Sequence, residues 1–190
     1  FRSDTMLGKE GDVNIHSHDN HIYYYASVTK KSALDLNTEI RKVTRTLKRI
    51  SSDYNSDPPP IYLHINSFGG SVFAALSSID TIINSDYPIV SIIEGSAASA
   101  ATLLSVSGHK RFMSENSLML IHQLSSSSSG KYNELTDDMD NFNTFMDIIK
   151  KIYYKHTKIT PNELNELLKH DLWLNSQKCL EYGLVDEITK

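Results

Sequence analysis

The sequence predicts an α/β fold with a mainly parallel sheet. Three apolar segments have the composition of strands, IYLHIN (61–66), PIVSIIE (88–94) and LMLIH (118–122), and segments with helical apolar spacing lie between them. Strands that alternate with helices form parallel sheets through right-handed crossovers. PIVSIIE is apolar along most of its length, which is typical of a strand covered by helices on both faces.

The composition is that of a single globular domain spanning residues 1–190, because 39% hydrophobic residues suffice for a core. The net charge is −4 and the basic residues alternate with acids, so we expect no nucleic-acid or membrane surface. No segment reaches the roughly 20 apolar residues of a membrane span, and the N-terminus lacks a signal-peptide pattern. The single cysteine, Cys179, agrees with a reducing compartment. These features predict a cytoplasmic or organellar protein that is not secreted.

The first half of the chain contains two predicted strands and two predicted helices. Residues 1–20 are polar and lack a sustained period, so we expect a mobile segment, whereas residues 21–28 are rich in β-forming residues. Apolar residues recur at helical spacing over residues 32–50, and three prolines at 58–60 end that helix. A second helix is predicted over residues 71–84, directly after the strand IYLHIN.

The alanine-rich segment that follows PIVSIIE predicts a helix starting near Ala97, and KRFM (110–113) predicts a short strand before LMLIH. A serine-rich segment at 125–130 precedes a long helix over about 132–156, and together they form a predicted handle region of about 125–157. The apolar stripe of this helix is long for a small domain. We therefore expect its apolar face to pack against a further surface.

The C-terminal segment carries clear helix boundaries. TPNE (160–163) is a capping box with proline in the first turn, opening a helix that extends to about Lys169. DLWL (171–174) is expected to be extended. Ser176 is predicted to cap a last helix, and Gly183 to end it before a strand in LVDEI.

Ser99 is a candidate nucleophile. It lies in EGSAASAATLL (94–104), where a strand turns into a helix, so its hydroxyl is expected at the carboxyl edge of the sheet near the positive end of a helix dipole. The surrounding alanines leave room for a substrate carbonyl. The alternative is a closely packed helix start, and the G-x-S-x-G elbow is absent.

Two glycines end the strand in INSFGGS (65–71). Glycine lets the backbone approach a ligand, so an N–H group there is able to face a developing oxyanion. A plain turn from strand to helix would also use glycine.

His122 ends the apolar strand LMLIH and is a candidate general base, provided that a carboxylate orients its second nitrogen. Asp171 is the candidate orienter, with Asp186 and Asp80 as alternatives left open by spacing. A histidine at a strand end is otherwise a hydrogen-bonded rim residue.

His16, His18 and His21 form an H-x-H-x-x-H pattern beside Asp19. The spacing would present two imidazoles on one face of a strand, but the segment has no cysteine ligands. We therefore expect a solvated arm and no metal site.

The succession of INSFGGS, GSAASAATLL, LMLIHQ and LNSQKCLEYGLVDEI closely resembles the ClpP (caseinolytic) serine protease family over about residues 61–188. The resemblance implies that Ser99 is the nucleophile, His122 the general base and Asp171 the residue that orients the imidazole. It further implies an oxyanion hole from the backbone N–H groups of Gly70 and Ala100.

The same resemblance implies a ClpP/crotonase-like fold with a protruding handle helix, and an endopeptidase without cofactor or metal. Such proteases cleave unfolded polypeptides inside two stacked seven-membered rings, and an ATP-driven AAA+ unfoldase is the implied partner. The handle would be buried against another subunit, and the serine-rich segment would pair with the substrate backbone. The implied substrate-binding residues are Gly69, Ser71, Leu124, Ser125 and Ser126.

The chain differs from the family pattern at Phe68 and Leu124, where proline is usual, and at Lys169 and His170, where Asp-Arg is common. One alternative is therefore a weakly active or inactive structural subunit of a mixed ring. Another is a crotonase-like acyl-CoA enzyme, since that fold also uses backbone N–H groups as an oxyanion hole.

Overall fold

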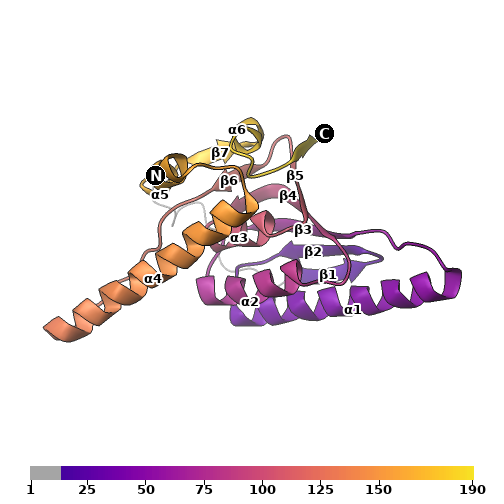
Figure 1. The fold of residues 1–190 in the computed structure, drawn as a ribbon, viewed down its shortest axis with the longest axis horizontal. Coiled ribbons are helices and arrows are strands. Elements are labelled where there is room, and N and C mark those ends of the chain that lie inside the picture. Colours follow the sequence, from indigo (N-terminus) through magenta and orange to yellow (C-terminus); the bar gives the residue numbers. More distant parts are fainter. Residues whose placement is uncertain (1–13) are drawn as a thin grey trace.

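The structure is a computed structural model and describes residues 14–190. It is built on a twisted sheet with helices against it, and a long helix projects away from the rest (Figure 1). The strands are β1 (Asn14–His18), β2 (His21–Tyr25), β3 (Ile61–Ser67), β4 (Ile89–Ala98), β5 (Lys110–Ser114), β6 (Leu118–Leu120), β7 (Trp173–Asn175) and β8 (Glu187–Thr189). The helices are α1 (Lys30–Tyr54), α2 (Val72–Ile83), α3 (Ala100–Val106), α4 (Tyr132–His156), α5 (Pro161–Leu168) and α6 (Ser176–Glu181).

The sheet order β1-β2-β3-β4-β5-β8 confirms the predicted α/β class. All neighbours from β2 to β8 on this path are parallel, and only β1 joins antiparallel, to β2. The long strand β4 changes partner along its length, because Val90–Ile93 pairs with β5 whereas Ser96–Ala98 pairs with β6. β6 in turn pairs antiparallel with β7. The carboxyl end of β4 is therefore held between β3 and β6.

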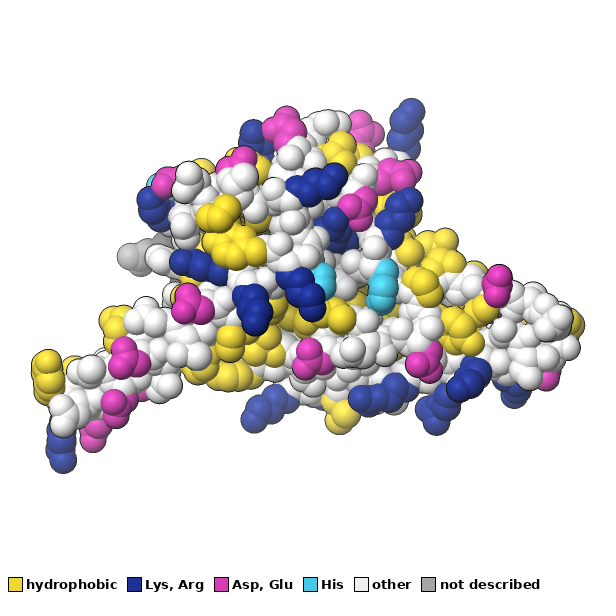
Figure 2. All heavy atoms as spheres, viewed as in Figure 1, with side chains coloured by type: hydrophobic (Ala, Val, Ile, Leu, Met, Phe, Trp, Pro, Cys, Tyr) yellow, Lys and Arg dark blue, Asp and Glu magenta, His cyan; other side chains and the backbone are white. Residues whose placement is uncertain are grey.

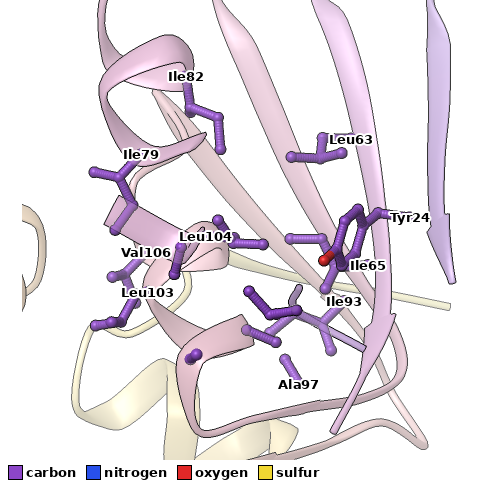
Figure 3. Packing of buried hydrophobic residues seen from close by; sticks show 14 of the residues in the cluster. Tyr24, Leu63, Ile65, Ile79, Ile82, Ile93, Ala97, Leu103, Leu104 and Val106 are labelled. Carbon is purple, nitrogen blue, oxygen red and sulfur yellow. The ribbon is translucent and has the colours of Figure 1, made fainter. Parts of the chain in front are cut away.

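The main core lies between the sheet and the helices α1, α2 and α3. Figure 3 shows side chains of α2 and α3 directed toward residues of the central strands. Leu63, Ile65 and Ile93 are fully buried, and Leu103 and Leu104 are almost so. Each such side chain contributes about 1.5–3 kcal/mol by leaving water.

Most predicted helices are confirmed with small shifts of their ends. α4 spans the predicted residues, and α1 is longer than predicted because Thr29 supplies a capping box at its start. Ser71 caps α2 and Thr160 caps α5, as the sequence indicates. The assignment of Ser176 as a cap is wrong, since the Asn175 side chain caps α6.

Two further predictions differ from the structure. A mobile segment was expected over residues 1–20, but Asn14–His18 form β1, which pairs with β2; residues 1–13 lie outside the described part. The helix expected near Ala97 begins at Ala100, because Ala97 and Ala98 belong to β4 and pair with Met119 and Leu120. Among the described helices none is both long and apolar enough to cross a membrane.

Candidate active site

Ser99 occupies the tight turn between β4 and α3. Its backbone has φ 54° and ψ −127°, which is unusual for a residue that carries a side chain. Two hydrogen bonds hold the turn: the Ser99 N–H donates to the carbonyl of Leu120 at 2.9 Å, and the Thr102 N–H donates to the carbonyl of Ser99 at 3.0 Å. Backbone in such regions is concentrated at functional sites, where the surrounding structure enforces it.

The glycine pair after β3 packs against this turn. Gly69 has φ 94°, and a β-carbon there would lie 2.5 Å from the Ala98 carbonyl oxygen and 2.7 Å from Cβ of Ser99. A β-carbon on Gly70 would lie 2.4 Å from the carbonyl oxygen of Val28. Glycine is therefore required at both positions, because it alone permits this approach of one backbone to another.

Two backbone N–H groups are free beside Ser99. The Val28 N–H donates to the carbonyl of Gly69, and the Ser71 N–H donates to the carbonyl of Val28, each at 2.7 Å. This pattern leaves the N–H of Gly70 between them without an acceptor among the described residues, and the N–H of Ala100 likewise has none. Ala100 is the first residue of α3, where N–H groups lack intrahelical partners.

His122 and Asp171 are brought together by β6 and α5. The Nδ1 atom of His122 lies 3.3 Å from Oδ1 of Asp171. His122 follows β6 by two residues, and the Gln123 N–H donates to the carbonyl of Leu168 at 3.1 Å, which ties the end of α5 to this segment. The His122 side chain is 26% exposed and that of Asp171 is 76% exposed.

The structure distinguishes Asp171 from Asp186 and Asp80, the two other aspartates considered as partners of the His122 imidazole. Asp186 accepts hydrogen bonds from the Arg111 side chain at 3.0 and 2.5 Å. Asp80 lies on α2 and lines a cavity next to α1. The Ser99 hydroxyl has no hydrogen-bond partner among residues 14–190, so its link to His122 is open in this conformation. Such bonds are often long in structures without substrate.

A cavity of about 400 Å³ adjoins the glycine loop. Ser71, Leu124, Ser125 and Ser126, four of the five residues predicted to bind substrate, line it, while Gly69 lies against Ser99 instead. The rest of the lining is apolar and comes mainly from α2 and α4: Val72, Phe73, Leu76, Phe142, Phe145 and Ile148.

The aromatic lining was missed by the sequence analysis. Phe73 and Phe145 meet edge to face, with ring centroids 5.0 Å apart. Phe142 and Phe145 belong to the apolar stripe of α4, which is also the pattern of a helix that packs on a core. Phe73 is 62% exposed and lies off the buried face of α2. In the sequence, the signal that could have indicated a site was a large aromatic residue outside the apolar positions of the predicted helix.

The histidines of the N-terminal pattern lie on the β1–β2 hairpin. His16 stacks on Tyr23, and His21 Nδ1 lies 2.8 Å from Nε2 of His64. His18 is exposed and lies 3.2 Å from Asp19. Within the described residues, no group of three or more His, Cys, Asp or Glu side chains is arranged to hold a metal ion.

Comparison with known proteins gives one family. The Clp protease family model matches residues 16–190. The chain is 33% identical over 142 residues to the ATP-dependent Clp protease proteolytic subunit of Streptococcus sanguinis (strain SK36), covering 72% of this chain and 71% of the relative. It is 30% identical over 138 residues to the protein of the same name from Deinococcus radiodurans, covering 72% and 68%.

Proposed function

Because the chain belongs to the Clp protease family, we propose that it is a serine endopeptidase, the proteolytic subunit of a self-compartmentalised ATP-dependent protease that cleaves unfolded polypeptides. The observation that carries the proposal is the turn at Ser99. This turn has a positive φ, lies against a glycine backbone and has two free N–H groups beside it.

In the proposed mechanism His122 accepts the proton of the Ser99 hydroxyl while Oγ attacks the substrate carbonyl. The N–H groups of Gly70 and Ala100 donate to the oxyanion that forms, and each such donor is worth about 10²–10³ in rate. His122 then gives its proton to the leaving amine, and water hydrolyses the acyl-enzyme by the same route. The carboxylate of Asp171 lies beside Nδ1 of His122 and fixes the orientation of the ring, so that Nε2 faces the Ser99 hydroxyl.

The cavity beside Gly70 supports binding of an apolar substrate side chain next to the scissile bond, since most of its lining side chains are apolar and three are phenylalanines. Residues 125–129 are exposed and belong to no helix or strand. Their free backbone groups support main-chain pairing with an extended substrate, which tolerates many side chains.

The proposal includes one domain over residues 1–190, a handle region of about 125–157, two stacked seven-membered rings and an AAA+ unfoldase as partner. The relatives are named as subunits of an ATP-dependent protease, which supports the ATPase partner. A reducing compartment is also part of the proposal, because the sequence has a single cysteine, Cys179, which is a free thiol.

A weakly active structural subunit is the second candidate function. It is favoured by the open link between Ser99 and His122 and by the exposure of Asp171. The acyl-CoA alternative loses its support, because the family match covers residues 16–190.

Labelling with a fluorophosphonate probe, read by intact mass, separates the first two candidates. The wild-type chain is expected to gain one adduct on Ser99, and Ser99→Ala to gain none. Ser96→Ala is the matched control, because Ser96 is buried and its hydroxyl donates to Asn66 at 3.2 Å. It should be labelled like the wild type. An unlabelled wild-type chain that still assembles into rings would instead identify a structural subunit.

A further inference from the structure

A second cavity lies at the edge of the sheet opposite to Ser99. It has a volume of about 230 Å³ and lies between the ends of α2, α3 and α4 and the start of β5. It adjoins the first residue of β4, Ile89, whereas Ser99 follows the last. The ten residues of β4 separate the two places by about 30 Å. The proposed peptidase mechanism does not use this cavity.

Four basic side chains line the cavity, namely His109, Arg111, Lys155 and His156. None of the described residues that line it is acidic. Figure 2 shows histidine side chains on this face, beyond the right-hand end of α2 and above α1, with Lys or Arg side chains to their left. Outside the lining, the carboxylate of Asp186 holds Arg111 in place by accepting hydrogen bonds from Nε and from a terminal guanidinium nitrogen.

The hydrogen bonds around the cavity fix which nitrogens are available as donors. The Ile89 N–H donates to Nδ1 of His109 at 3.1 Å, so the proton of the neutral ring is on Nε2. Arg111 also donates to the carbonyls of Gly183 and His156, which makes it a rigid part of the wall. Lys155 is in no ion pair within the described residues, so its ammonium is free to move toward a ligand.

The pKa of His156 reflects its burial and the positive charge gathered around the cavity. Burial lowers its pKa, and the positive charges of Lys155, Arg111 and His109 lower it further. Basic groups that converge without an anion repel one another, and a bound anion would remove this repulsion.

We propose that this cavity binds a phosphate group, either as free phosphate or as part of a small phosphorylated molecule. Lys155 and Nε2–H of His109 donate to its oxygens, and His156 takes up a proton when the anion binds. The volume equals that of about eight water molecules, which admits a phosphate group but not a folded domain. Ammonium and imidazole donors are the usual partners of such an oxyanion.

Isothermal titration of the assembled protein at constant ionic strength tests the proposal, with inorganic phosphate and AMP as separate probes. Lys155→Gln is expected to weaken binding of either probe about tenfold, because one charged hydrogen bond is lost. His109→Asn should weaken it as well, since the amide oxygen replaces Nδ1 as acceptor for Ile89 but no group replaces Nε2–H. Tighter binding of AMP than of phosphate would identify a phosphorylated molecule as the ligand, and equal binding would identify phosphate itself.

Lys151→Gln is the matched control, because Lys151 is exposed on the same helix one turn earlier and does not line the cavity. It should bind like the wild type. Absence of any binding heat at tens of millimolar phosphate, or equal weakening by Lys151→Gln and Lys155→Gln, would overturn the proposal.

Discussion

At the scale of single residues, Gly69 controls the geometry of the proposed nucleophile. In Gly69→Ala the new methyl group collides with the Ala98 carbonyl and with Cβ of Ser99, and the positive φ adds strain. We expect kcat/KM for a fluorogenic peptide to fall about 100-fold, since displacement of a reacting group by about 1 Å costs that much.

Gly130→Ala is the control for this substitution. A β-carbon on Gly130 would meet first the carboxylate end of Glu134, which is a flexible side chain able to move aside. Activity close to wild type is expected for Gly130→Ala. If Gly69→Ala were equally active, the contact between the glycine loop and the Ser99 turn would not matter for catalysis.

A second residue-scale prediction concerns the histidine pair on the open face of the sheet. His21 Nδ1 lies 2.8 Å from His64 Nε2, and His64 Nδ1 lies 2.7 Å from Glu94. Burial lowers the pKa of His21, as do His64 and His18, while Asp19 and Glu94 oppose them. A lowered pKa means that the unfolded chain binds the proton more tightly, so the free energy of unfolding falls as the pH drops below about 6.5.

The urea midpoint should therefore fall between pH 7.5 and pH 5.5, and His21→Asn should show a smaller fall. Asparagine offers an N–H near the position of Nδ1 but does not titrate in this range. His170→Asn replaces an exposed histidine and should keep the wild-type pH dependence. Equal pH dependence of all three proteins would show that the His21–His64 contact does not control acid stability.

The residues of the site could be predicted from the sequence better than its shape. Ser99, His122 and Asp171 were predicted from the family resemblance that four ordered motifs carry, and the 3.3 Å contact of His122 with Asp171 agrees with that prediction. The positive φ of Ser99 could not be predicted, because it depends on two contacts. The Leu120 carbonyl of β6 accepts a hydrogen bond from the Ser99 N–H, and Gly69 carries no β-carbon that would collide with Ser99. Both are contacts between segments distant in sequence.

At the scale of elements, helices with caps and an apolar face were predictable, whereas strands defined by pairing were not. The apolar stripes and capping residues give α1, α2, α4 and α5 within a few residues. β1 was missed because its polar sequence lacks a strand pattern and its order comes from pairing with β2. The alanine-rich composition around Ala97 and Ala98 favours a helix, but the pairing of these two residues with β6 outweighs that preference.

The cap of α5 gives the element-scale prediction. The Thr160 hydroxyl accepts a hydrogen bond from the Glu163 N–H, and the Glu163 carboxylate accepts one from the Thr160 N–H at 2.8 Å. Thr160→Ala should lower the free energy of unfolding by about 1 kcal/mol. The Leu168 carbonyl at the end of α5 accepts a hydrogen bond from the N–H of Gln123, which is next to His122. A less stable α5 should therefore lower peptidase activity as well.

Thr136→Ala makes the same chemical change inside α4, where the threonine hydroxyl only donates to the Tyr132 carbonyl. Alanine favours the helix interior, so chemical denaturation should show no loss of stability there. Equal effects of the two substitutions would exclude a capping role for Thr160.

At the scale of the whole molecule, the first turns of α4, before Phe142, leave nearly all of their side chains exposed. Only Ile149 and Tyr153 of this helix are buried, and both lie near its C-terminal end. Leu135 and Met139 are 42% and 60% exposed and lie one turn apart on one side. Figure 1 shows this part of α4 projecting beyond the sheet, and apolar side chains are visible at its tip in Figure 2.

An uncovered helix of this length gains little stability from its own turns, because helical stability in proteins comes mostly from packing of an apolar face. In the proposed ring assembly, that face is buried against another subunit. The double substitution Leu135→Gln and Met139→Gln removes apolar surface from the contact without opening a cavity in the subunit core. We therefore expect sedimentation velocity to show a smaller assembly, while far-ultraviolet circular dichroism remains that of a folded α/β chain.

The matched control is Leu34→Gln and Tyr54→Gln, which also removes two exposed apolar side chains but from α1. This variant should sediment like the wild type if α4 is the helix that joins the rings. Loss of assembly only in the α1 variant would place the contact on the other side of the molecule. The apolar stripe of α4 would then serve only the cavity lined by Phe142 and Phe145, and its length beyond Phe142 toward Tyr132 would have no role in packing.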